Sequence, residues 1–567
     1  MSEFSKIVDK KGIDVISEVK FENTDIEIAF LNKFDVILGK GVEINFLNQD
    51  LVDIFMAVEI NEYNVDYLKK TNWTDLREHF ENHTTNKRSI RIYNDFLEYL
   101  KKEIGIISKL DSDIYSKRDD FNISEDLSDK LSKFGVELEF DYTEPPKKIT
   151  VNDFTLFFNR RLEYFTKLLR ARASIDIDTV MRISQLKDFF ETNTSVTIIG
   201  LISDIKETKN GHYMISIEDK SGEIKCFVNK DKKEMINKIQ NFCLDEGIGV
   251  RGKIGKNIIW TDEFIIPSPP NNMELRATDK EEYVVTLSDI HFGAKVFVDD
   301  AFQKFLEFIN GRSSNDALNR IANKVKHIII PGDIIEGIGI YPNQGKDARI
   351  LSTELQYHEA ARWLSKIPSD KAIIIIPGNH DTSRLSEPQP KLPYEKAYAL
   401  YHMPNVINLS NPSIVRLFSD DPSGGLRFYL YHGGSFFYYG DKIQKLRDKG
   451  GMKVPNEIVK FLLEKRHLAP SHGSTLYIPD NQKDPLVIEK MPDFFITGHT
   501  HKLDVSNYKG CTIVSCGCWV EMSDYQEKMG MYPDIGKCIL LNMKTRMPKV
   551  LNFYSGDNKV VKRDSAE

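Results

Sequence analysis

Five short polar blocks, each directly behind an apolar run, constrain this chain more than any other feature of its sequence. In chain order they are Asp289-Ile-His291, Gly332-Asp333, Gly378-Asn-His-Asp381, His432-Gly433 and Gly498-His-Thr-His501. The apolar runs at 283–287, 325–330, 372–376, 428–431 and 493–496 have the length of buried strands, and helical stretches alternate with them. Ligands of such α/β sheets bind where strands end and loops begin, so the blocks are expected to meet in one site.

The residue types in these blocks suit a site for two metal ions. Phosphodiester hydrolysis by two ions needs several ligands for each ion, one bridging oxygen ligand and an open position for water. Carboxylate, imidazole and amide oxygen together suit Mn, Fe or Zn better than an all-oxygen magnesium site. The alternating spacing predicts that Asp289 and His291 point to the same side of an extended strand, and that His499 and His501 do the same.

Each block alone is a weak signal, whereas the ordered set is specific. An isolated Asp-x-His mostly arises by chance, Gly-Asp after a strand is an ordinary turn, and His-x-His means little in a chain with 13 histidines. The histidines outside the set are predicted to be surface or core residues. They are His79, His83, His212, His327, His358, His402, His467 and His472.

Length and composition describe an ordinary globular protein of two to four domains. The chain has 567 residues, of which 41% are hydrophobic and 28% charged, and a net charge of -7. A nucleic-acid-binding protein with this charge must concentrate its basic groups locally. Six cysteines without a C-x-x-C pair predict reduced, mostly buried thiols in a cytoplasmic protein. No signal peptide opens the chain and no apolar run is long enough to span a bilayer, so no membrane partner is expected.

The periodicity of the apolar residues and local changes in composition divide the chain into segments. We expect a small module at 1–60, a charged linker or loosely packed region at 61–150, a helical connector at 151–189, an OB-fold domain at 190–270, an α/β domain that carries the five polar blocks at 280–555 and a tail at 556–567. The helix at 151–172 has an apolar stripe, with Arg160, Arg161, Lys167, Arg170 and Arg172 mostly off it. We favour a helix that docks through its apolar stripe and leaves its basic residues in solvent. The alternative is a helix whose basic residues lie near nucleic acid.

The OB-fold prediction rests on three strands, a helix and two strands between about 190 and 268. Such a barrel can bind single strands or can dock protein partners. Few of its aromatic residues are expected to be exposed for base stacking, so docking is favoured over strand binding.

The five blocks resemble the calcineurin-like metallophosphoesterases, which implies a layered α/β/β/α sandwich. Three further segments resemble the small, exonuclease subunit of archaeal family D DNA polymerase: Gly332-Asp-Ile-Ile-Glu-Gly-Ile-Gly-Ile-Tyr-Pro342, Glu387-Pro-Gln-Pro390 and Tyr525-Gln-Glu-Lys528. An OB-fold barrel before the phosphoesterase domain also fits that family. The resemblance is strong over about 150–555 and weak before 150, where the family is variable.

The resemblance implies a role for each polar residue. Asp289, His291 and His501 would bind the first ion, and Asp333 would bridge both ions. Asn379, His432 and His499 would bind the second ion. His380 would be the acid that protonates the leaving oxygen. Glu336 stands where relatives often have Asp and is not counted as a ligand, and Arg384 would either grip a phosphate or pair with a neighbouring carboxylate.

The resemblance also implies a function, a 3′–5′ proofreading exonuclease in a two-subunit replicative DNA polymerase. Two divalent ions are implied, with Mn favoured over Fe or Zn. The implied partners are the large catalytic subunit, single-stranded 3′ ends of DNA and a sliding clamp. The alternatives are a catalytically silent scaffold that docks the large subunit, or a stand-alone repair nuclease or phosphatase. The complete ligand set argues against a silent scaffold, and the OB-fold barrel with Glu387-Pro-Gln-Pro390 argues against a stand-alone enzyme.

Overall fold

The computed structural model of the chain describes residues 122–555, apart from gaps at 144–147, 173–178, 191, 272, 343, 481, 523–525 and 527–529. Before residue 122 it describes 8, 10–15, 19, 21, 24–57, 65, 68, 69 and 71–81. The predicted C-terminal tail at 556–567 and the middle of the predicted linker, 82–121, lie outside the described residues.

Two six-stranded sheets form the centre of the C-terminal half, with the orders β12-β11-β10-β9-β18-β19 and β16-β17-β15-β14-β13-β3. The first contains β9 Tyr283–Thr286, β10 Val325–Pro331, β11 Ala372–Ile376, β12 Val406–Asn408, β18 Lys537–Asn542 and β19 Pro548–Asn552. The second contains β3 Val136–Phe140, β13 Ser413–Leu417, β14 Leu426–Leu430, β15 Phe494–Thr497, β16 Asp504–Tyr508 and β17 Cys511–Ser515. Strands β9 to β12 are mutually parallel, and so are β14, β15 and β17.

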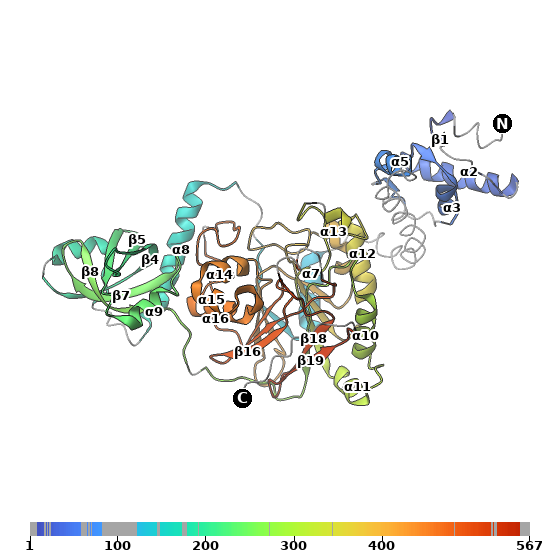
Figure 1. Cartoon of the computed structure of the whole chain (residues 1–567). Helices are drawn as coiled ribbons and strands as arrows, with labels where there is room; N and C mark the ends of the chain where they lie inside the picture. The colour runs from blue at the N-terminus through green and yellow to red at the C-terminus, as the bar shows by residue number, and fades with distance from the viewer. Residues whose placement is uncertain are drawn as a thin grey trace.

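The two sheets pack face to face and helices cover their outer faces (Figure 1). Ile329 and Ile374 of the first sheet share one buried cluster with Phe428 and Ile496 of the second. Outside the first sheet lie α10 Asp299–Ile309, α11 Asp316–Ala322, α12 Thr353–Leu364 and α13 Tyr394–Tyr401, and outside the second lie α14 Phe436–Lys442, α15 Gln444–Lys449 and α16 Pro455–Lys465. Strands covered on both faces must be apolar throughout, as β11 is. The predicted α/β/β/α sandwich is confirmed.

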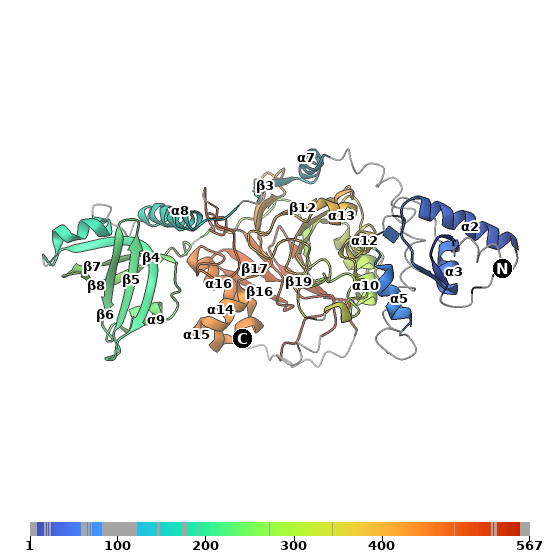
Figure 2. The same cartoon turned by 90° about the horizontal axis from the view of Figure 1, so that it is seen from above.

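A closed barrel precedes the sandwich and confirms the predicted OB fold. Its strands are β4 Ser195–Glu207, β5 Tyr213–Asp219, β6 Gly222–Val228, β7 Gly247–Ile254 and β8 Ile258–Ile265, in the order β4-β5-β6-β8-β7, and α9 Lys233–Ile239 joins β6 to β7. Both views place the barrel at one end of the molecule and the N-terminal helices at the other (Figures 1 and 2).

Helix α8 Val151–Arg170 lies between the barrel and the sandwich. Phe165 and Leu162 pack on Leu201 of the barrel, while Arg161 reaches the sandwich. Arg161 is only 1% exposed and its Nε donates to Asp484 at 2.7 Å. The helix docks as expected, but the expectation that Arg161 belongs to a solvated basic face is wrong, because its charge is paired inside the interface.

The N-terminal module extends beyond the predicted boundary at residue 60. Its described elements are β1 Asp14–Val15, α2 Thr24–Gly39, β2 Phe46–Leu47, α3 Gln49–Ala57 and α5 Trp73–Glu81. The Trp73 ring lies against Phe46 and Phe55, so α5 completes the same core.

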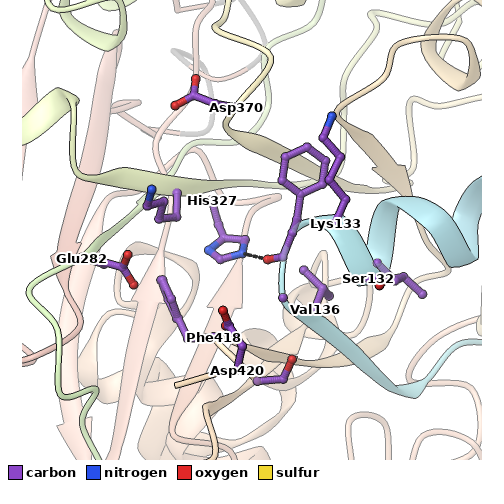
Figure 3. A pocket seen from close by; sticks show the side chains of 13 residues that line it. Ser132, Lys133, Val136, Glu282, His327, Asp370, Phe418 and Asp420 are labelled. Carbon is purple, nitrogen blue, oxygen red and sulfur yellow. Dashed lines mark hydrogen bonds between the residues drawn. The ribbon is translucent and has the colours of Figure 1, made fainter. Parts of the chain in front are cut away.

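Part of the predicted linker belongs to the phosphoesterase domain. Helix α7 Ile123–Lys133 packs on the sandwich, and β3 pairs antiparallel with β13. The Phe134 carbonyl accepts from His327 Nε2 at 2.9 Å, at the rim of a pocket of about 600 Å³ that also contains Phe418 and Asp420 (Figure 3). The prediction of a linker is therefore wrong for 123–140, because Leu127 and Leu131 of α7 are covered by the sandwich and the buried Lys130 donates to Tyr401 O at 2.7 Å.

Two further features concern the cysteines and the helices. All six cysteines are free and buried. None of the helices that the structure describes has both the length and the apolar character needed to cross a bilayer.

Candidate metal centre

The five polar blocks lie in loops at the carboxyl ends of parallel strands. Asp289 and His291 follow β9, Asp333 follows β10, residues 378–381 follow β11, His432 follows β14, and His499 and His501 follow β15. All of them therefore lie at one end of the two packed sheets, as expected for an α/β site.

The ligand residues are not extended, which corrects the prediction made from their spacing. The backbone φ is 52° at Asp289, 54° at His291, 51° at Asp333, 70° at His499 and 55° at His501. Such left-handed conformations are uncommon for residues other than glycine and persist where surrounding contacts impose them. Those contacts include hydrogen bonds from Asp289 N to Gly332 O at 3.2 Å and from His499 N to Asp289 Oδ2 at 3.0 Å.

One group of candidate ligands consists of Asp289, His291 and His501. His501 Nε2 lies 3.3 Å from Asp289 Oδ1 and 3.3 Å from His291 Nε2. The other ring nitrogens point away: His291 Nδ1 is 3.1 Å from Glu336 Oε2, and His501 Nδ1 is 2.9 Å from the Gln526 amide. Contacts of this kind orient metal-binding imidazoles, so the Nε2 atoms are the available donors.

A second group consists of Asp333, His432 and His499, with Asn379 beside them. His432 Nε2 lies 3.3 Å from Asp333 Oδ2 and 3.0 Å from Asn379 Oδ1. His432 Nδ1 donates to Pro331 O at 2.8 Å, which again leaves Nε2 facing the group. Because Asp333 Oδ2 is also 3.9 Å from His291 Nε2, Asp333 lies between the two groups.

The charges of the site fit divalent cations. Burial would raise the pKa of Asp333, but the charges of His432 and His380 outweigh it and hold that pKa well below its usual value. Burial lowers the pKa of the His432 imidazole, but Asp333 raises it by more, so that this pKa is about 9. At His499, burial and the charge of His432 act in the same direction and lower the pKa to about 3. Buried carboxylates that attract positive charge, next to imidazole donors, are a chemically suitable ligand set for Mn, Fe or Zn.

His380 and Glu336 lie at the edge of the first group. His380 Nδ1 donates to the Glu336 carbonyl at 2.7 Å, so Nε2 is the nitrogen available to a substrate. The backbone N–H of His380 donates to Asp333 Oδ1 at 2.8 Å. The Glu336 carboxylate lies between His291 and His380, and those imidazoles overcome burial to lower its pKa to about 2. Glu336 is thus a positioning residue that sequence reasoning left out of the site.

Two glycines leave room for the ligand side chains. A Cβ on Gly378 would lie 2.2 Å from Asp333 Oδ1. Gly332 has φ +100°, and a Cβ there would lie 2.3 Å from His432 Nδ1. Any side chain at either position would therefore displace a candidate ligand.

A buried hydrogen-bond network connects the loops and was not predicted. Asp381 accepts from Gly378 N at 2.8 Å and from Tyr357 OH at 3.1 Å, and burial raises its pKa to about 7. Gln389 donates to Gly378 O at 3.1 Å and accepts from Asn411, whose own Oδ1 accepts from His432 N at 3.0 Å. The only available sequence signal was the position of Gln389 within Glu387-Pro-Gln-Pro390.

Arg384 holds its own loop. Its guanidinium donates to Ser386 O at 3.2 Å and to Pro388 O at 2.7 Å, and it lies over the Tyr142 ring. These partners are carbonyls rather than the neighbouring carboxylate that sequence reasoning offered as one alternative. Binding of phosphate by Arg384 stays a prediction.

Two exposed aromatic rings flank the candidate ligands. Phe437, at the start of α14, is 44% exposed and its ring centroid lies 5.1 Å from that of His499, at a steep angle. Tyr341 is 38% exposed, lies 6.1 Å from the His380 ring, and donates to Glu336 at 3.0 Å. Large apolar groups of this kind beside a polar site are available to a ligand that carries flat rings.

Comparisons with known proteins agree with this geometry. Residues 283–503 match the calcineurin-like phosphoesterase family, and residues 196–282 match a family of OB-fold nucleic acid binding domains. The DNA polymerase II small subunit of Methanothermobacter thermautotrophicus is 35% identical over 392 residues, which are 69% of this chain and 78% of that protein. The protein of the same name from Methanocaldococcus jannaschii is 34% identical over 399 residues, 70% of this chain and 64% of that protein. That from Pyrococcus furiosus is 31% identical over 474 residues, 80% of this chain and 74% of that protein.

Proposed function

Because the chain belongs to the family of archaeal DNA polymerase II small subunits, we propose that its phosphoesterase domain is a working 3′–5′ proofreading exonuclease of a two-subunit replicative DNA polymerase. The observation that carries the proposal is the convergence of a complete ligand set with His380 at the ends of parallel strands. Its partners would be the large catalytic subunit, single-stranded 3′ ends of DNA and a sliding clamp.

The ligand residues would hold two divalent ions. Asp289, His291 and His501 would hold one, Asn379, His432 and His499 the other, and Asp333 both. Mn is the first expectation for these ions, and Fe or Zn are the alternatives. The ions would neutralise negative charge on the phosphate and lower the pKa of a water molecule, so that the water could attack the phosphate after losing a proton. Glu336 keeps His291 oriented, and Pro331 O does the same for His432.

His380 would supply a proton to the departing sugar oxygen. Its Nδ1–H is committed to the Glu336 carbonyl, which leaves Nε2 to carry the proton that is transferred. Its backbone donates to Asp333, so the imidazole stands beside the ligands without being one of the predicted set. A general acid positioned in this way typically contributes about 10²–10⁴-fold in rate.

The flanking aromatic rings favour a polynucleotide over a small phosphomonoester. Phe437 offers an exposed ring beside His499, and a base next to the scissile bond could stack on it. Phe437→Ala should therefore raise KM for single-stranded DNA while leaving hydrolysis of bis(p-nitrophenyl) phosphate nearly unchanged. Equal losses on both substrates would mean that the ring only supports His499.

A silent scaffold is the second candidate, and fidelity of the assembled polymerase separates the two. The complex with the large subunit is prepared with the wild-type chain and with Asp333→Asn, which removes charge at the shared ligand but keeps its shape. The exonuclease proposal predicts normal nucleotide incorporation, loss of excision of a mismatched 3′ nucleotide and a higher error frequency. Unchanged excision and error frequency would support the scaffold instead.

A further inference from the structure

The two residues that follow β3 lie at the end of the sandwich that carries the candidate ligands. Strands β3 and β14 both pair antiparallel with β13, so they run in the same direction. The end of β3 therefore lies at the same edge of the second sheet as the end of β14, which His432 follows. Asp141 and Tyr142 come directly after β3; only 4% of the Asp141 side chain is exposed, and Tyr142 is buried.

Asp141 and Tyr142 hold Ser410, a residue in the loop between β12 and β13. Asp141 Oδ1 accepts from Ser410 N at 2.8 Å, and Tyr142 N donates to Ser410 Oγ at 2.7 Å. The other carboxylate oxygen of Asp141 lies 2.8 Å from Lys391 Nζ. Because Ser410 is fully buried, bulk water is not available to replace these partners.

Ser410 precedes Asn411, which joins two loops of the metal centre. Asn411 and Gln389 exchange two backbone hydrogen bonds, of 2.7 and 2.9 Å, and Asn411 Nδ2 donates to Gln389 Oε1 at 2.6 Å. Asn411 Oδ1 accepts from His432 N at 3.0 Å. Since Asn411 is only 1% exposed and bonds to both loops, a shift of Ser410 would be transmitted to the backbone of His432.

Tyr142 gives the same loops a second support. The Arg384 guanidinium lies 5.2 Å over the Tyr142 ring, an arrangement in which a cation is attracted by the face of the ring. The backbone carbonyl of Arg384 accepts from Gln389 Nε2 at 2.9 Å. The loop that contains Gln389 is therefore held through Tyr142 as well as through Asn411.

We propose that Asp141 and Tyr142 are positioning residues of the metal centre, which hold His432 through Ser410 and Asn411. The inference rests on the proposed function and deepens it, because it assigns support of the second group of candidate ligands to a segment that precedes the barrel in the chain. Among the residues that the structure describes, His432 is the only candidate ligand to which Asn411 is hydrogen-bonded. Loss of the support should therefore weaken one ion more than the other.

Amide hydrogen exchange of the metal-free full chain tests the proposal before any hydrolysis is measured. Asp141→Ala removes the acceptor of Ser410 N, so exchange in peptides that cover 431–436 should become faster than in the wild type. Titration with Mn should then show binding of one of the two ions weakened by about 2- to 30-fold and the other unchanged. Asp141→Asn keeps an oxygen that can accept from Ser410 N and should restore both measurements.

Two further variants make the test specific. Glu139→Ala is the matched control, because the partners of Glu139 are Arg416 on β13 and Arg427 on β14 rather than residues of the ligand loops. It should lower the unfolding midpoint while leaving exchange at 431–436 and Mn binding as in the wild type. Tyr142→Leu removes the ring beneath Arg384, should weaken the same ion, and provides the test if Asp141→Ala does not fold.

Two results would overturn the proposal. One is unchanged exchange at 431–436, or unchanged Mn affinity, in a folded Asp141→Ala chain. The other is an equal loss of Mn in Asp141→Ala and Glu139→Ala, which would mean that the segment only stabilises the domain. Failure of the exonuclease proposal is distinguishable from both, because a chain that binds Mn without shortening DNA would refute that proposal and leave the exchange and Mn results valid.

Discussion

Replacement of His380 by alanine separates metal binding from proton transfer. The change removes an imidazole whose Nδ1 is held by the Glu336 carbonyl and whose Nε2 is left for the substrate. It keeps the backbone N–H that donates to Asp333 Oδ1 at 2.8 Å, so the shared ligand should stay in place. We therefore expect His380→Ala to retain its metals and its DNA affinity while turnover falls.

The size of the effect follows from the role. Loss of a general acid costs about 10²–10⁴-fold, which corresponds to about 3 to 5 kcal/mol of barrier. The assay compares a single-stranded oligonucleotide with a p-nitrophenyl phosphodiester, whose leaving group needs little protonation. His380→Ala should show most of its loss on the oligonucleotide and a partial recovery on the activated ester. The metal content of the purified chain is measured in parallel. The matched control is His402→Ala, which removes a histidine directly after the end of α13.

Two outcomes would refute this reasoning about His380. If His380→Ala loses metal as severely as His499→Ala, His380 is a ligand or a structural support, and the acid lies elsewhere. If the activated ester and the oligonucleotide are slowed equally, proton transfer to the leaving group is not what the imidazole supplies.

Three further predictions concern the ligand loops and the barrel interface. Gly378→Ala places a Cβ 2.2 Å from Asp333 Oδ1, so bound metal and hydrolysis should both fall sharply, as metal analysis and nuclease assays would record. Arg161→Met leaves the buried Asp484 without its guanidinium partner and should cost about 3–5 kcal/mol in urea unfolding. Burial, followed by the charge of Arg161, lowers the pKa of His467 in the folded chain to about 4. As pH falls, the unfolded chain therefore binds a proton at His467 at a higher pH than the folded chain does. Stability should therefore drop by about 2 kcal/mol between about pH 7.5 and about pH 5, and His467→Gln should flatten that dependence.

Matched controls make these outcomes specific. At Gly345 a Cβ would have its nearest neighbour at 3.8 Å, so Gly345→Ala should keep its metal. Arg160 is exposed on the same helix as Arg161, so Arg160→Met should change stability by less than about 1 kcal/mol. Retained metal in Gly378→Ala, an unchanged unfolding midpoint in Arg161→Met, or a pH profile that His467→Gln leaves unaltered would each contradict the corresponding argument.

The convergence of the candidate ligands could be predicted from sequence because each block directly follows a buried strand. A parallel strand delivers the residues after its carboxyl end to the same edge of the sheet, so Asp289, Asp333 and His432 meet although they are far apart in the chain. The left-handed backbone at Asp289 and His291 could not be predicted from their spacing. It results from hydrogen bonds between loops, which exist only in the folded chain.

Other features escaped prediction because their partners lie on distant segments. Glu336 and Gln389 are single polar residues in loops, and only the fold shows that they orient His291 and connect Gly378 to the His432 loop. The strand β3 is short and lies in a charged region, so only its antiparallel pairing with β13 in the folded chain identifies it as a strand of the second sheet.

The central claim is that the seven candidate ligands form a working site that removes nucleotides from 3′ ends. The most direct measurement digests a 5′-labelled and a 3′-labelled single strand with the purified chain, in Mn and in chelator, beside Asp333→Asn. We predict a ladder of progressively shorter 5′-labelled products and immediate release of the 3′ label as mononucleotide, both in Mn only and neither with Asp333→Asn. A ladder from the 3′-labelled strand, or cleavage that persists in chelator or in Asp333→Asn, would contradict the account.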